Sequence, residues 1–313
     1  MKEFFSNYKN SVIISTVLTV LQFFSYFGNY SNNHSITETI GINRISSSYG
    51  FFYFMGLNIF IITAIIIMIV AIISAIKNDS KRTFSFNDSF LFKYLFPIIL
   101  LLYLSYSTIL TFVLKKIGIN IKDFNTWEKT IVLILFEFIF LLFLCFIYRK
   151  DLKEEFIIFK NNFKSIISFS LKYWCIGLLL MGLSNIILHF VLHSSPNNES
   201  QVQKLLSEMP VYVAIISCFF APFIEELIFR KSLSKCFSNT LLFIICSGLI
   251  FGLLHVITSK NMIEFLYIIP YGLFGSIFAY IYYKTKTIFS TITIHMIHNT
   301  ILIIISLISL GVM

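Results

Sequence analysis

Long uncharged runs of apolar residues are the feature that most constrains the fold of this chain. Of its 313 residues 57% are hydrophobic and only 12% are charged, and the apolar residues gather in segments separated by short polar stretches. About 20 apolar residues span a bilayer as an α-helix, whereas the strands of a membrane β-barrel are short and alternate in polarity. The sequence therefore predicts an all-α, polytopic transmembrane helix bundle with about eight or nine spans. The candidate spans are 12–27, 50–76, 94–114, 130–148, 168–192, 211–229, 241–257, 263–283 and 288–312.

The positive charges are distributed unevenly between the loops on the two sides of the predicted spans. The net charge is +9, and Lys and Arg are concentrated at the N-terminus and in the loops that follow every second span. Because such cations mark cytoplasmic loops, we expect the N-terminus inside and the C-terminus outside, in a membrane that is a bacterial cytoplasmic membrane if the chain is bacterial. The cations are explained by topology and by contact with the lipid bilayer, so no nucleic-acid partner is expected.

Two adjacent glutamates, Glu225 and Glu226, lie inside the apolar segment 221–230. An ionisable residue within a membrane span is costly, and it indicates a functional site when a partner can be named. Arg230 lies one helical turn after Glu226 on the same face. It would fix the Glu226 carboxylate and leave Glu225 freer to act as a base. A purely structural ion pair between Glu226 and Arg230 is the alternative.

Two of the following spans carry imidazole groups. With a rise of about 1.5 Å per residue, Glu225 and His255 come out nearly level on antiparallel helices, and His295 several ångströms lower. A carboxylate and an imidazole at one depth can hold and deprotonate a water molecule, as amide hydrolysis requires. His295 and Asn299, one turn apart, can donate to the oxyanion of a tetrahedral intermediate. We interpret His298 as a packing residue or a secondary donor.

These polar motifs, each in its own apolar span, resemble the signature of the CAAX protease and bacteriocin-processing (CPBP/Abi) family of intramembrane endopeptidases. The motifs are Glu225-Glu226-x-x-x-Arg230, Phe251-x-x-x-His255 and His295-x-x-x-Asn299.

The resemblance covers about a third of the chain. It implies a four-helix catalytic core at 206–313, preceded by a membrane-spanning region of unassigned role at 1–205. It also implies that Glu225 and His255 activate the water and that His295 and Asn299 stabilise the oxyanion. One departure is Lys231, where family members often have glycine; this changes the exit of the helix.

The implied function is hydrolysis of a peptide bond in a membrane-associated peptide or protein, in peptide maturation or in bacteriocin processing or immunity. The family has been described both as metalloproteases and as glutamate-dependent enzymes. The chain has no His-Glu-x-x-His motif, so we expect no cofactor. A zinc site made of Glu225, His255 and His295 is the alternative. A non-catalytic membrane scaffold or regulator is the competing function, and a transporter is a third, although no two related halves are visible.

Overall fold

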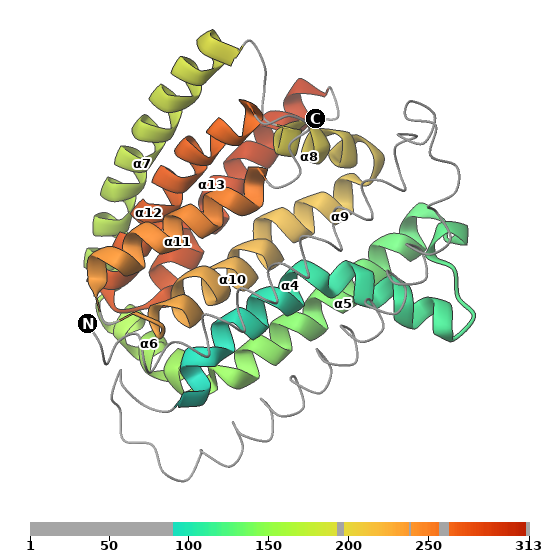
Figure 1. Ribbon diagram of the computed structural model, residues 1–313, viewed down its shortest axis with the longest axis horizontal. Helices are drawn as coiled ribbons and strands as arrows, with labels where there is room; N and C mark the ends of the chain where they lie inside the picture. The colour runs from blue at the N-terminus through green and yellow to red at the C-terminus, as the bar shows by residue number, and fades with distance from the viewer. Residues whose placement is uncertain (1–89, 193–196, 238, 257–262, 311–313) are drawn as a thin grey trace, which may run out of the picture. The chain divides into compact units, whose positions relative to one another are not determined.

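The computed structural model describes residues 90–192, 197–237, 239–256 and 263–310, and the chain divides into two compact units, 1–119 and 120–313. The first unit contributes the helix α4 (Phe90–Lys116). The predicted spans 12–27 and 50–76 lie outside the described residues. The second unit holds all the candidate site residues (Figure 1).

The described part of the second unit is helical and contains no strand, which confirms the all-α prediction. Its elements are η2 (Ile121–Asp123), α5 (Thr126–Ile147), α6 (Arg149–Asn161), α7 (Phe163–Leu192), α8 (Asn197–Glu208), α9 (Pro210–Ile215), η3 (Ile216–Phe220), α10 (Ala221–Glu226), η4 (Leu227–Ser232), α11 (Thr240–Val256), η5 (Ile263–Tyr267), α12 (Ile268–Thr285) and α13 (Ile288–Ser309).

Five helices of the described chain are long and apolar enough to cross a membrane, and a bent segment within α4 would make a sixth. Four of the five correspond to α5, α7, the continuous run Pro210–Ser232 and α13, and the fifth joins η5 to α12. The helix α11 is apolar but shorter, with 17 residues. The protein is therefore an integral membrane protein.

Local sequence signals explain where two of these helices begin. Asn125 and Glu128 form a capping box at α5, in which each side chain accepts a hydrogen bond from the backbone N–H of the other residue. At α13 the Thr287 side chain accepts a hydrogen bond from the N–H of Phe289. Lys286, with φ of 57°, and Thr287 form the short turn between α12 and α13, so these two helices are antiparallel neighbours.

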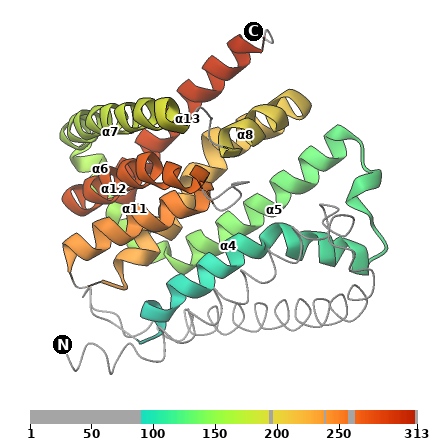
Figure 2. The same ribbon diagram turned by 45° about the horizontal axis from the view of Figure 1, so that its top comes forward.

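The bundle around the candidate site includes more than the last four spans. The α12 helix lies between α11 and α7, and α7 also packs on α13 (Figures 1 and 2). Trp174 and Leu178 of α7 pack against a buried cluster formed by Phe274, Phe278 and Ile294. The bundle around the four C-terminal helices thus also includes α7, which lies before the expected core 206–313 in the sequence.

Glycines bring the backbones of α11 and α12 into close contact. A Cβ atom at Gly248 would lie 2.4 Å from the Gly272 carbonyl oxygen, and one at Gly252 would lie 2.8 Å from both the Gly272 nitrogen and the Ile268 carbonyl oxygen. Small residues four apart are a common device for close packing of membrane helices. Here they hold α11, which carries His255, directly against α12.

We expect Gly252→Ala to destabilise the protein, because backbone atoms of α12 would have to move to admit the new methyl group. Overpacking of this kind costs about 1–3 kcal/mol, and backbone cannot yield as a side chain can. The measurement is thermal unfolding of the purified protein in detergent. The matched control is Gly182→Ala in α7, where a Cβ would meet nothing within 4 Å and alanine should be neutral or stabilising. Equal melting temperatures for the two variants would contradict the close packing.

Candidate active site

The two glutamates lie between two distortions of one continuous helix. The run Pro210–Ser232 is α-helical at its start and at α10, but η3 and η4 are π-helical segments. Single π-helical turns within α-helices are frequent at functional sites. Glu225 and Glu226 are the last two residues of α10, directly before η4.

Glu226 is the centre of a buried polar cluster. Its Oε1 atom lies 3.0 Å from Nη1 of Arg230 and 2.9 Å from Nδ1 of His295. Glu226 is 0% exposed and Arg230 1% exposed. The ion pair predicted between Glu226 and Arg230 is therefore present, and it also holds the imidazole of α13.

The Arg230 guanidinium is enclosed by groups of α11 and α12, of which only Phe251 belongs to a sequence motif. Its Nη2 donates to the carbonyl oxygen of Gly275 on α12 at 3.1 Å. The guanidinium carbon lies 4.7 Å from the centroid of the Phe251 ring and 5.3 Å from that of Phe278. Cation–π contacts of this kind are strongest where water is excluded. Arg230 is thus fixed by two other helices, α11 and α12.

His255 is oriented by its own helix and by α12. Its Nδ1 atom lies 2.9 Å from the carbonyl oxygen of Phe251. Because a carbonyl oxygen only accepts, Nδ1 carries the proton and the neutral ring presents the lone pair of Nε2. The ring stacks on Tyr271, with centroids 4.6 Å apart and planes at 26°. Glu225 and His295 are both near enough to His255 to act on it electrostatically.

Glu225 faces the second imidazole at a longer distance than Glu226 does. Its Oε2 atom lies 3.9 Å from Nε2 of His295, and its side chain is 15% exposed. A hydrogen bond requires a shorter distance. His295 therefore holds Glu225 less closely than it holds Glu226, although both glutamates belong to the same turn of α10.

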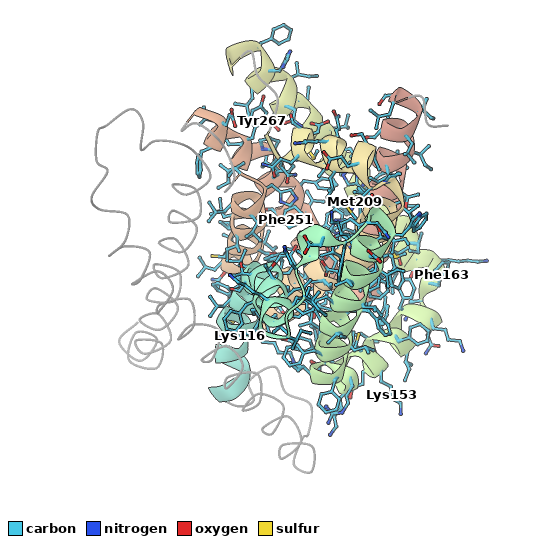
Figure 3. The ribbon with its side chains drawn as sticks, turned by 90° about the vertical axis from the view of Figure 1, so that its right-hand side faces the viewer. Lys116, Lys153, Phe163, Met209, Phe251 and Tyr267 are labelled. Carbon is cyan, nitrogen blue, oxygen red and sulfur yellow. The ribbon has the colours of Figure 1, made fainter. Side chains whose placement is uncertain are left out.

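The Phe251 ring joins the two imidazoles. Its centroid lies 4.5 Å from that of His255 and 6.3 Å from that of His295, and Phe251, labelled in Figure 3, is buried. A narrow internal gap is lined by Phe251, Arg230, His295 and two aromatic residues of α12. Arg230, His255 and His295 thus all lie around the Phe251 ring, and Glu225 and Glu226 both face His295.

Asn299 binds a backbone carbonyl, whereas His295, one turn earlier, binds a side chain of the motifs. Its Nδ2 atom donates to the carbonyl oxygen of Ser217 in η3 at 2.8 Å. His298 is buried against Phe274 and Trp174, with ring centroids 4.6 Å and 6.4 Å away, so it is a packing residue.

The zinc alternative requires three ligands that can share one ion. Among the described residues, no three His, Cys, Asp or Glu side chains form such a group. Zinc ligands lie about 2.0–2.3 Å from the ion. Within the candidate set, the Oε2 atom of Glu225 and the Nε2 atom of His295 lie 3.9 Å apart.

A second polar network surrounds Lys231, at the C-terminal end of the continuous helix Pro210–Ser232. The buried Glu155 carboxylate of α6 accepts from the Lys231 ammonium, from the Tyr282 hydroxyl at 3.2 Å and from the Ile288 N–H at 2.6 Å. It therefore connects η4, α12 and the start of α13. The sequence motifs did not indicate Glu155, and the one signal for it was the unusual lysine directly after Arg230.

Asp151 completes this network from the preceding turn of α6. Its Oδ2 atom lies 3.1 Å from Nζ of Lys231 and 2.5 Å from Nζ of Lys235. Burial acts to raise the pKa of Asp151, but the two lysines outweigh burial and hold the pKa below its usual range. The exit of the helix that carries the glutamates is thus anchored to α6.

Comparisons with known proteins agree with the motifs. Residues 207–301 match the family model described as Type II CAAX prenyl endopeptidase Rce1-like. A Bacillus subtilis (strain 168) protein named "Putative membrane peptidase YdiL" is 27% identical over 137 residues. This match covers 42% of the present chain and 53% of the Bacillus protein, so the chain spans about half the length of that relative. No solved structure matches the chain.

The match at 207–301 contains all three motifs, from Glu225 to Asn299. The resemblance to the CAAX protease family is thereby confirmed. The match begins at the end of α8 and ends within α13, whereas α5, α6 and α7 lie outside it.

Proposed function

We propose that this protein, whose residues 207–301 match the CAAX prenyl endopeptidase family, is an intramembrane endopeptidase that needs no metal. The observation that carries the proposal is the buried Glu226 carboxylate, which binds Arg230 and His295 at once and leaves Glu225 facing the same imidazole. Such a cluster within apolar helices is costly, and a catalytic role accounts for it.

Glu225 and His255 are the pair that activates the water. The Nε2 lone pair of His255 accepts a hydrogen bond from the water, and the Glu225 carboxylate takes a proton from it as its oxygen attacks the scissile carbonyl carbon. The same proton can then pass to the leaving amine, which completes hydrolysis without another reactant. Glu226 is assigned a different role, because its Oε1 atom binds both Arg230 and His295.

His295 is the electrophilic partner in this proposal. Its Nδ1 atom is engaged by Glu226, so Nε2 is the ring atom directed toward Glu225 and the reacting carbonyl. When the ring carries both protons, Nε2–H can donate to the oxyanion of the tetrahedral intermediate. Glu226 would act on catalysis through this orientation of His295.

The proposed substrate is a membrane-associated peptide or protein. Glu225 and His295 lie on helices long and apolar enough to cross the bilayer, and His255 lies on the shorter apolar helix α11, so the scissile bond would enter the membrane region. The family name points to prenylated C-terminal peptides. For a bacterial chain, maturation of a precursor peptide, or processing of or immunity to a bacteriocin, is the corresponding role.

The proposal predicts that purified protein in detergent or liposomes cleaves members of a panel of apolar and lipidated peptides, with and without a chelator. Product masses would identify the scissile bonds. Cleavage should be unchanged by the chelator, since the proposed mechanism uses no metal. Loss of cleavage on chelation, restored by zinc, would contradict the metal-free mechanism. A scaffold would bind peptides without producing fragments.

A further inference from the structure

We propose that Asn299 is a positioning residue, which acts by binding a backbone carbonyl that Pro222 leaves without a main-chain donor. The inference rests on the proposed function, because its consequence is the placement of Glu225. It assigns to Asn299 a role other than the oxyanion contact that the family resemblance implies.

The hydrogen-bond register of η3 differs from that of an α-helix. The N–H of Ala221 donates to the carbonyl oxygen of Ile216, which is a π-type bond across five residues. In this register the next donor would be the N–H of residue 222, directed at Ser217. Residue 222 is proline and has no N–H. The change of register thus leaves the Ser217 carbonyl oxygen without a main-chain donor.

The Ser217 carbonyl has a side-chain partner on α13. Nδ2 of Asn299 donates to the Ser217 oxygen at 2.8 Å, from a position 82 residues later in the sequence. In a bilayer no water is at hand for an unpaired backbone oxygen, and proline within membrane helices is tolerated where a neighbouring side chain replaces the missing bond. Asn299 supplies that bond.

The bond between Asn299 and Ser217 also affects the orientation of the helix that carries the glutamates. His295 and Asn299 are one turn apart on α13 and bind Glu226 and Ser217, respectively. Two contacts at different heights, one in η3 and one in α10, oppose rotation of the continuous helix Pro210–Ser232 about its own axis relative to α13. Since Glu225 is in the same turn as Glu226, its direction toward His295 depends on both contacts.

The test is a double-mutant cycle between Asn299→Ala and Pro222→Ala. Alanine at 222 restores an N–H that can reach the Ser217 carbonyl, so the asparagine is no longer required. We expect Asn299→Ala to lower kcat by about 10- to 100-fold in the natural background, because a small misplacement of a catalytic group has effects of this size. In the Pro222→Ala background the same change should lower kcat by less than about threefold, since the positioning effect is then removed.

The control is Thr300→Ala, an exposed neighbour on α13, which should leave kcat unchanged in both backgrounds. Equal loss of kcat on Asn299→Ala in the two backgrounds would overturn the proposal, because an oxyanion donor is needed whatever residue stands at 222. Asn299→Asp, which cannot donate when ionised, should behave as Asn299→Ala does.

A measurement independent of cleavage separates this inference from the proposed function. With a ¹³C-labelled carbonyl at Ser217, the amide I band should shift to higher frequency in Asn299→Ala and return in the double variant. No shift would overturn the proposed bond even if the protein is a protease. A shift in a protein that cleaves nothing would support the bond and refute the proposed activity.

Discussion

Replacing Glu225 with glutamine is expected to lower kcat/KM by at least about 1,000-fold, within the range of about 10²- to 10⁴-fold that a positioned acid–base group contributes. Glutamine keeps the size of the side chain but cannot accept a proton from water. The Glu225 side chain is partly exposed and lies 3.9 Å from His295, so the substitution should not disturb the neighbouring ion pair. The measurement is the initial rate of peptide cleavage by detergent-solubilised protein.

The matched control for this experiment is Glu208→Gln, which removes an exposed carboxylate at the end of α8. It should retain the full rate. His255→Ala should lose activity as Glu225→Gln does, while both variants still insert and keep their helical content. Full activity in either Glu225→Gln or His255→Ala would refute the proposed water-activating pair.

The second large effect is expected at Arg230, where methionine should destabilise the protein as well as inactivate it. Removing one partner of a buried ion pair leaves an uncompensated charge, at a cost of about 3–5 kcal/mol. Here the remaining Glu226 carboxylate is 0% exposed. The phenyl rings of Phe251 and Phe278 would also lose the guanidinium that they enclose. The measurement is the free energy of unfolding in mixed detergent micelles, together with the cleavage rate.

A second substitution tests the electrostatic origin of this effect. In the double variant Glu226→Gln/Arg230→Met no buried charge is left unpaired, so much of the stability should return. The side-chain oxygen of the introduced glutamine could still accept a hydrogen bond from His295. If the double variant is less stable than Arg230→Met alone, the destabilisation is due to lost packing rather than to the unpaired carboxylate.

Two helix starts could be predicted to within one residue from the sequence, whereas α5 and α7 begin four and five residues before the expected positions 130 and 168. The last span was expected from residue 288, where α13 begins, and the span after the glutamates from 241, one residue after the start of α11. These positions follow from long apolar runs bounded by polar residues, which depend only on local sequence. The pairing of Glu226 with Arg230 also follows from helix periodicity.

The internal shape of the site could not be predicted in the same way. The π-helical segments beside α10 depend on which carbonyls find a partner on another helix, as Ser217 does with Asn299. The attachment of His295 to Glu226 depends on the relative rotation of two helices, because these residues are 69 positions apart in sequence. Enclosure of the arginine by a glycine carbonyl and two phenyl rings likewise requires the packing of α11 on α12. Such contacts are tertiary, and a single sequence carries no period that reports them.

The pairing of Lys231 and Lys235 with acids of α6 has a consequence for membrane insertion. A newly inserted helix hairpin is oriented by its flanking cations before distant segments have packed against it. In the folded protein these two lysines are bound to Asp151 and Glu155, and Lys231 is buried. Their charge is therefore available to direct insertion during biogenesis and is neutralised internally once the bundle has assembled.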